Sequence, residues 1–142
     1  MKVRQLSVFL ENKVGRLAKV THLLGSANVN IRALSVADTH DFGILRLIVD
    51  NVEAAEKCLQ EGNFVCRINN VTVVAVDNQP GGLAKVLVAL NAANINVEYM
   101  YAIAEPKSEH PMMVFRFGEG ERAIAALKAA EVEILSEEEL FS

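Results

Sequence analysis

Two short turns hold the residue types best suited to binding a small charged molecule. Each places an asparagine and a glycine where an alternating apolar segment gives way to helical spacing. A helix start leaves backbone N–H groups without partners and carries partial positive charge, so it attracts a carboxylate. The asparagine amide offers a donor and an acceptor, which suits an α-amino acid. In the alternative, these residues only shape the turn and cap the helix. The turns are Asn12-Lys13-Val14-Gly15-Arg16-Leu17 and Asn78-Gln79-Pro80-Gly81-Gly82-Leu83.

The two turns belong to an internal repeat. Asn12 aligns with Asn78, an offset of 66 residues, and 10 of the 20 positions from Asn12 to Ile31 are identical between the copies. The match weakens beyond residue 38, and the second copy carries a longer loop near residues 104–111. We therefore expect two domains, 1–69 and 70–142, with the loop absorbing the insertion.

Apolar spacing predicts the order strand, helix, strand, strand, helix, strand in each copy. Period-two alternation indicates strands, and recurrence at three or four residues indicates helices. Each copy is then an α+β domain with a ferredoxin-like βαββαβ plan, an antiparallel sheet with helices on one face. The expected strands are 6–11, 31–37, 44–49, 64–68, 71–76, 95–103, 113–117 and 132–135, and the expected helices are 15–27, 52–61, 81–93 and 121–130.

Two further features concern surfaces. Phe9, Tyr99 and Tyr101 are candidates for a sheet face left bare unless something pairs with it, or else they lie under the helices. Ser136 followed by Glu139 resembles a capping box that opens a short helix, and the alternative is a frayed acidic tail.

The composition of the chain argues against some classes of function. The chain has 142 residues, a formal net charge of −4, 51% hydrophobic residues and 23% charged residues, which is ordinary globular usage. Without a basic excess, direct nucleic-acid binding is not expected. Because no apolar run approaches the roughly 20 residues of a membrane span and no signal peptide is apparent, we expect a cytoplasmic protein without membrane association. Cys58 and Cys66 are expected to be reduced, small buried hydrophobes.

The remaining polar residues give little support for catalysis. Asp38, His40 and Asp41 cluster in an expected hairpin loop, where a metal or acid-base site is possible in principle but a solvated turn is commoner. His22 and His110 have no orienting partner nearby in the sequence. We therefore expect no catalytic residues, no metal and no cofactor.

The turn, helix and Asn94-Ile95-Asn96 segments together resemble the ACT domain family, and the resemblance covers both halves of the chain. It implies the binding of small molecules, most often amino acids, at interfaces between paired domains. Val14 departs from the family's usual proline, and it keeps an N–H that Pro80 lacks, so the two turns are not equivalent. The ligand-binding candidates are Asn12, Val14, Gly15, Arg16, Leu17, Asn30, Asn78, Gly81, Gly82, Leu83 and Asn96.

The resulting hypothesis is a regulatory protein that senses an amino acid at a domain or subunit interface and signals to a partner protein. Two small domains per chain favour a homodimer. The alternatives are a small acylphosphatase-like hydrolase, for which Arg16 beside Asn12 is the nearest match, and an assembly module without a ligand.

Overall fold

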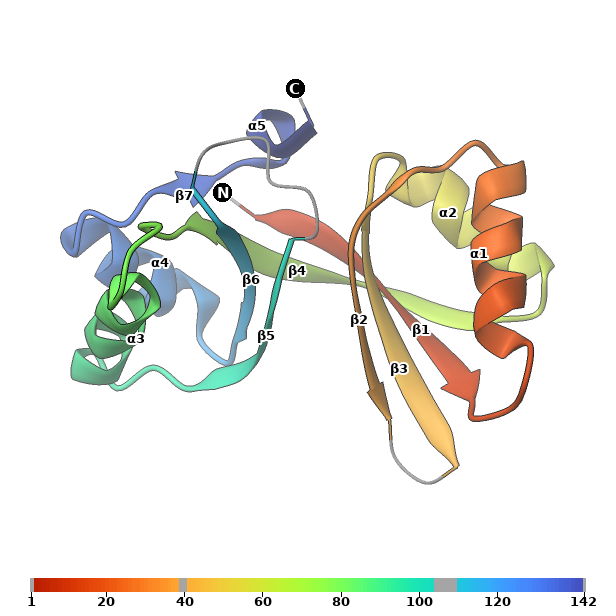
Figure 1. Ribbon diagram of the computed structural model, residues 1–142, viewed down its shortest axis with the longest axis horizontal. Coiled ribbons are helices and arrows are strands. Elements are labelled where there is room, and N and C mark those ends of the chain that lie inside the picture. The colour runs from red at the N-terminus through yellow and green to blue at the C-terminus, as the bar shows by residue number, and fades with distance from the viewer. Residues whose placement is uncertain (1, 39–40, 104–109, 142) are drawn as a thin grey trace. The chain divides into compact units, whose positions relative to one another are not determined.

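The computed structural model describes residues 2–38, 41–103 and 110–141. The chain divides into two compact units, here named the first unit (Arg4–Asn69) and the second unit (Met1–Val3 with Asn70–Ser142). The elements, labelled in Figure 1, are β1 Val3–Glu11, α1 Arg16–Ser26, β2 Ile31–Asp38, β3 Phe42–Val49, α2 Val52–Glu61, β4 Val65–Ala75, α3 Gly82–Ala92, β5 Val97–Ala102, β6 Met112–Phe117, α4 Gly120–Ala129, β7 Ile134–Leu135 and α5 Glu137–Phe141.

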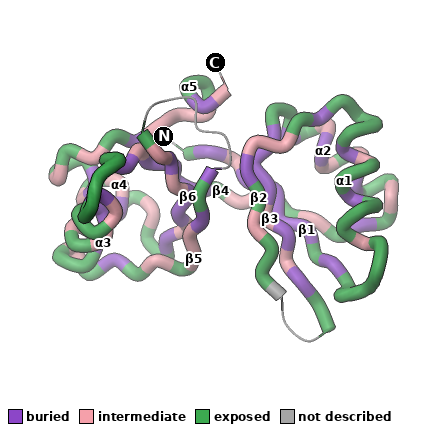
Figure 2. Tube along the Cα trace, viewed as in Figure 1, coloured by how far each residue is buried: buried purple, intermediate pink, exposed green. Residues whose placement is uncertain are grey.

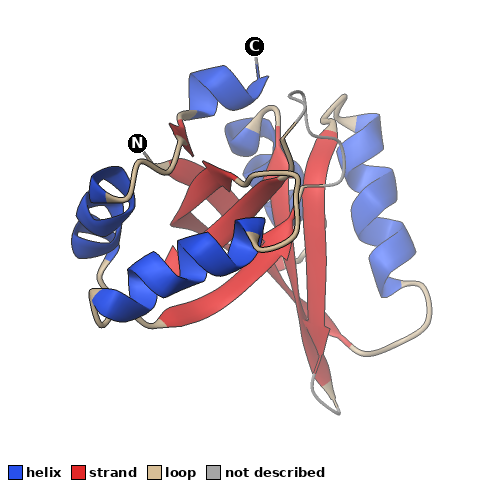
Figure 3. Cartoon of the chain, turned by 60° about the vertical axis from the view of Figure 1, so that its left-hand side comes forward, coloured by secondary structure: helices blue, strands red, loops and turns tan. Residues whose placement is uncertain are grey.

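The first unit confirms the predicted plan. Its strand order is β2-β3-β1-β4, and β3 pairs antiparallel with both β1 and β2. The helices α1 and α2 contact each other and cover one face of these strands (Figures 1 and 3). Leu6 lies opposite Leu47, and Val8 lies opposite Leu45, and all four are buried. Because successive side chains alternate between faces, these pairs define the helix-covered face.

The second unit repeats the plan with β4, α3, β5, β6, α4 and β7. β4 pairs antiparallel with β6 and β7, and β6 pairs with β5. The predicted last strand, 132–135, is longer than the observed β7. The N–H of Val132 bonds back to the carbonyl of Leu127 as α4 ends, so the ladder begins with the carbonyl of Glu133, which accepts from Ala75. The exit of the helix therefore shortens the strand.

Equivalent residues of the two copies build the two cores. Val20 and Leu24 are the buried residues of α1, and Val86 and Leu90, 66 positions later, are buried in α3. The rest of α1 is exposed or half-buried, and the buried residues beside it lie mainly on the strands (Figure 2). The repeat therefore preserves the helix-to-sheet contacts that make each unit fold.

One prediction about the strands is wrong. Two separate strands, 64–68 and 71–76, were expected, one closing the first copy and one opening the second. The structure has the single strand β4 across both. Ser7 donates a hydrogen bond from Oγ to Oδ1 of Asn69 at 2.8 Å, and Arg116 donates from Nη1 to the carbonyl of Asn70 at 2.6 Å. Partners at both asparagines keep the backbone extended.

The four long helices end in the same way. The residue after each C-cap has a positive φ, between 58° and 68°, and the two N–H groups that follow the C-cap bond back to carbonyls of the last turn. This is the Schellman motif, in which glycine or asparagine is favoured. The four left-handed residues are Asn28, Asn63, Asn94 and Glu131. The first asparagine of the repeated Asn-x-Asn segment therefore has a structural role.

The register also settles the position of the aromatic residues. Phe9 lies opposite Ile44, and Tyr101 lies opposite Val114, each out of phase with the core residues of its strand. Tyr99 shares the face of Tyr101. All three lie on the face away from the helices, so the alternative position under the helices is wrong. Phe9 is 42% exposed, whereas Tyr101 is buried.

The C-terminal segment is ordered by the capping box rather than frayed. The N–H of Ser136 donates to Oε1 of Glu139 at 3.1 Å, and the N–H of Glu139 donates to Oγ of Ser136 at 3.2 Å. The short helix α5 follows, and it buries Leu140. Within the described part of the chain, the helices are too short or too polar to cross a bilayer.

Candidate ligand-binding site

The first turn joins β1 to α1 through a left-handed glycine. Gly15 has a φ of 89° and occupies the N-cap, where no side chain accepts a hydrogen bond from the helix. The N–H groups of Asn12, Lys13 and Arg16 bond to backbone carbonyls within the first unit. Those of Val14, Gly15 and Leu17 have no backbone acceptor among the described residues. Donors at a helix start are therefore available to an anion.

A cavity of about 320 Å³ lies against this turn. The turn forms one wall, and residues of β1, β2 and β3 form the other. Gly43 lies opposite Leu10 in the β1–β3 ladder, on the helix-covered face, and its missing side chain helps to leave space below the turn. The lining residues are Leu10, Glu11, Asn12, Lys13, Val14, Gly15, Arg16, Leu17, Val36 and Gly43.

Charged groups of both signs stand at this cavity. Lys13 Nζ lies 2.9 Å from Glu11 Oε2, and this hydrogen bond and charge lower the pKa of the Glu11 carboxyl below its ordinary value. Arg16 holds its guanidinium 4.7 Å from the centre of the Phe64 ring, and its Nε is buried without a hydrogen-bond partner in the described chain. The residues that line the cavity therefore include one with an ionised carboxylate and two with cationic side chains.

The second turn has the same left-handed glycine but is packed more tightly. Gly81 has a φ of 85° at the N-cap of α3. A Cβ placed on Gly82 would lie 2.0 Å from the carbonyl oxygen of Asp77, whereas the equivalent residue of the first turn is Arg16. Pro80 has no N–H to offer. The two turns thus share a backbone plan but present different groups.

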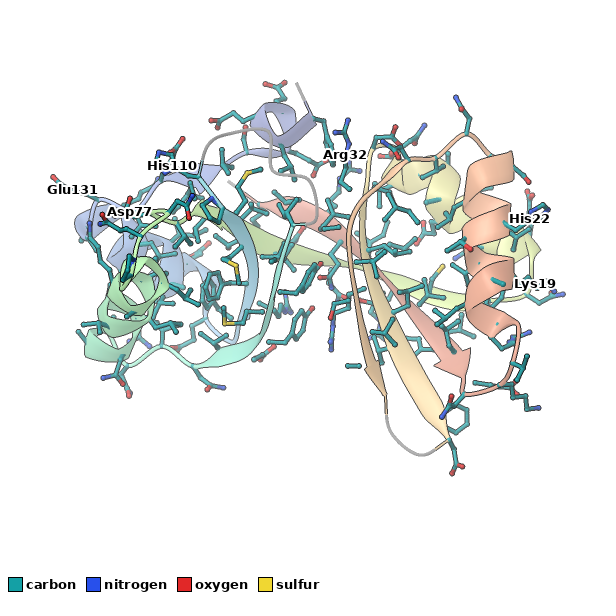
Figure 4. All side chains as sticks on the ribbon, in the orientation of Figure 1. Lys19, His22, Arg32, Asp77, His110 and Glu131 are labelled. Atoms are coloured by element: carbon teal, nitrogen blue, oxygen red, sulfur yellow. The ribbon has the colours of Figure 1, made fainter. Side chains whose placement is uncertain are left out.

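Cavities also contact the second turn. One of about 170 Å³ lies between α3 and the segment before β7, and it is lined by Ala75, Val76, Asp77, Gly82, Lys85, Val86, His110, Glu131, Val132 and Glu133. A more open one of about 410 Å³ is lined by Asp77, Asn78, Gln79 and His110. Figure 4 shows Asp77, His110 and Glu131 in this region, with Lys19 and His22 on α1. Gly81 and Leu83 line neither cavity.

The structure brings together some of the predicted residues. Asn12, Val14, Gly15, Arg16 and Leu17 share the first cavity. In the second unit, Asn78 and Gly82 line different cavities, and Asn96 is exposed just before β5.

Asn30 lies apart from the first turn, beyond the other end of α1. Its N–H donates to Oδ1 of Asp50 at 2.9 Å, and its carbonyl accepts from the N–H of Asp50 at 3.2 Å. A metal or acid-base site in the hairpin loop would need Asp38, His40 and Asp41. His40 and the side chain of Asp38 lie outside the described residues.

Sequence reasoning missed the part of the cavity that comes from the other strands. Val36 and Gly43 are far from the turn in the sequence, and only strand pairing brings them close to it. Leu10 and Glu11 adjoin the turn, and Lys13 belongs to it. The alternation of β1 gave a signal for Leu10, which had to face the helices.

These features define a pair of ferredoxin-like domains, each with a glycine turn between its first strand and first helix. The family model described as "ACT domain pair" matches residues 1–142. The chain therefore belongs to the ACT domain pair family, which confirms the resemblance drawn from the sequence. A comparison with curated proteins finds no match.

Solved structures agree with this assignment. Protein BT0572 from Bacteroides thetaiotaomicron is 40% identical, with a TM-score of 0.92 over 100% of this chain and 97% of that chain. The regulatory subunit of aspartate kinase from Thermus thermophilus, in its ligand-free form, is 15% identical, with a TM-score of 0.61 over 90% and 89%. Its counterpart from Thermus flavus is 19% identical, with a TM-score of 0.59 over 90% of each chain. The two kinase subunits show likeness in fold.

Proposed function

We propose that the chain is a regulatory protein that binds an α-amino acid at the first turn. The observation that carries this proposal is a single cavity lined both by residues whose N–H groups have no backbone acceptor among the described residues and by the ionised carboxylate of Glu11. The N–H groups of Val14, Gly15 and Leu17 suit the ligand's carboxylate, and Glu11 suits its ammonium group. A zwitterionic amino acid would thus place its carboxylate against the N–H groups of the turn and its ammonium group against Glu11.

The first turn is the better site of the two. Val14 supplies an N–H where the second turn has Pro80. The contact between Gly82 and Asp77 closes the second turn, and its cavities do not reach Gly81. We therefore propose that the second turn serves mainly to build its own unit.

The regulatory role is supported by family membership and by fold. The chain belongs to the ACT domain pair family and resembles in fold the regulatory subunit of an aspartate kinase. A ligand changes a protein's output only by binding one of its states better than another. We propose that the amino acid does so here and alters contact with a partner protein. The site gives little support to the hydrolase alternative, because Arg16 is stacked on Phe64.

Thermal unfolding with each of the twenty amino acids tests the proposal. A ligand that binds only the folded state stabilises it by about 2.7 kcal/mol at a hundredfold excess over its Kd. We expect at least one amino acid to raise Tm, and Gly15→Asp to abolish the effect by repelling the carboxylate. Gly15→Asn is the matched control, since Asn also tolerates a positive φ but carries no charge. Gly81→Asp should leave binding unchanged.

Two results would contradict the proposal. If no amino acid raises Tm or gives heat in a titration, the ligand-free assembly module becomes the better description. If Gly15→Asp and Gly15→Asn bind equally well while Gly81→Asp fails to bind, the site has been assigned to the wrong turn.

A further inference from the structure

We infer that the ligand is an amino acid with an aliphatic side chain, selected by Leu10, Val36 and the space above Gly43. This inference rests on the proposed function and specifies the class of ligand. It follows from the wall of the cavity that faces the turn, and it brings in two residues from β2 and β3 that the turn motif does not contain.

The charged groups of this cavity all lie on its turn side, which also includes the apolar residues Val14 and Leu17. Glu11, Lys13 and Arg16 all belong to the end of β1 and to the turn. The strand side presents Leu10, Val36 and Gly43, which have no side-chain donor or acceptor. A ligand held by its ammonium and carboxylate groups at the turn therefore directs its side chain towards the strands.

The pairing register accounts for the apolar residues of this wall. Leu10 lies opposite Gly43, and one step along the same face Val8 lies opposite Leu45, which in turn lies opposite Val36. Val8, Leu10 and Leu45 belong to the core of the first unit. The ligand side chain would thus extend the core of the first unit at a point where a strand residue has no side chain.

This wall disfavours the other ligand classes. An acidic side chain would lose water without gaining a partner among Leu10, Val36 and Gly43, and the β2–β3 ladder places another acidic residue, Asp38, opposite Gly43. None of the described residues that line the cavity is aromatic, so a ring has no ring to stack on. An aliphatic side chain gains contact and loses nothing, and each buried methylene changes affinity by roughly 10- to 200-fold.

Gly43 sets how much space is available. It is not among the glycines with a positive φ, so its backbone accepts another residue. It also lies within a strand, where valine is favoured over glycine. Gly43→Val should therefore keep the fold while filling the space under the turn, which separates a loss of binding from a loss of structure.

Isothermal titration of the full chain with valine, leucine, isoleucine, phenylalanine, aspartate and lysine tests the inference. We expect the tightest aliphatic ligand to bind at least about tenfold more tightly than the other three. Gly43→Ala should weaken its binding, and Gly43→Val should weaken it by about a hundredfold or more, with an unchanged circular dichroism spectrum. Val65→Ala, on β4 and outside the cavity lining, is the control and should bind normally.

The outcomes separate this inference from the proposed function. Tightest binding of aspartate, lysine or phenylalanine, lost in Gly15→Asp, would overturn the aliphatic class and leave amino-acid binding in place. Unchanged leucine affinity in Gly43→Val would overturn the assigned wall. Absence of binding by every amino acid would overturn the proposed function and this inference together.

Discussion

At the scale of single residues, the two turns show how one backbone plan supports different surroundings. Both turns use a left-handed glycine at the N-cap, and both leave the N-cap without a side-chain bond. The next residue differs. Arg16 stacks on Phe64, whereas Gly82 allows the backbone of Asp77 to approach. Gly82, which looks like part of a binding motif, is thus explained by its packing against the backbone of Asp77.

Gly82→Ala should destabilise the protein, because its Cβ would overlap the carbonyl oxygen of Asp77, 2.0 Å away. Overpacking of this kind costs about 1–3 kcal/mol or more. Gly25→Ala is the control, since nothing lies within 4 Å of its Cβ and it sits within α1. It should stabilise by roughly 0.5–1 kcal/mol. Urea unfolding measures both, and similar values for the two variants would refute the packing explanation.

At the scale of elements, the helix ends are the most regular feature of the chain. Four Schellman motifs close α1, α2, α3 and α4, and three of them use asparagine at the left-handed position. Glu131 is the exception. It also lines the polar cavity beside Asp77 and His110.

Glu131→Asn should raise the stability of the chain by up to about 1 kcal/mol, because a left-handed conformation costs most residues roughly 1–2 kcal/mol and costs asparagine less. Asn28→Ala should lower stability for the same reason. Differential scanning calorimetry gives both values. A lower Tm for Glu131→Asn would mean that the Glu131 side chain stabilises the second unit through the polar cavity.

Much of the fold was predictable from the sequence, and the reason lies in local patterns. Val20, Leu24 and their copies at Val86 and Leu90 repeat at helical spacing, so the helices and the core-facing stripe could be read directly. The turn side of the candidate site was also predictable, because its residues are adjacent in the sequence. The continuity of β4 was not, because Asn69 and Asn70 are typical turn residues.

The strand half of the site was unpredictable for a different reason. Gly43 meets Leu10, and Val36 meets Leu45, through pairings between distant segments. Such a register depends on loop lengths and on burial across the whole sheet. The sequence pattern indicated only a hairpin loop at Asp38 to Asp41 followed by the strand 44–49.

At the scale of the whole molecule, the exposed apolar residues of β2 support the expected homodimer. β2 is the edge strand of the first unit, and Leu34 and Val36 are 50% and 46% exposed. An uncovered apolar edge tends to pair with another chain, and two-fold pairing is the commonest arrangement.

Light scattering should therefore give a mass of twice 15.5 kDa at micromolar concentration. Leu34→Lys should shift the mass towards a single chain, because a lysine on each edge opposes pairing. Val65→Lys is the control, as Val65 is 68% exposed on β4 rather than β2. A single-chain mass for the unmodified protein would exclude the homodimer.

The unbroken strand β4 belongs to both copies. Cys66 and Ile68 contact the core of the first unit, and Val74 belongs to the core of the second. The last strand of one copy and the first strand of the next are therefore a single element. The boundary between the two units, at Asn69 and Asn70, falls inside a strand and not in a loop, so the copies form a repeat without a linker.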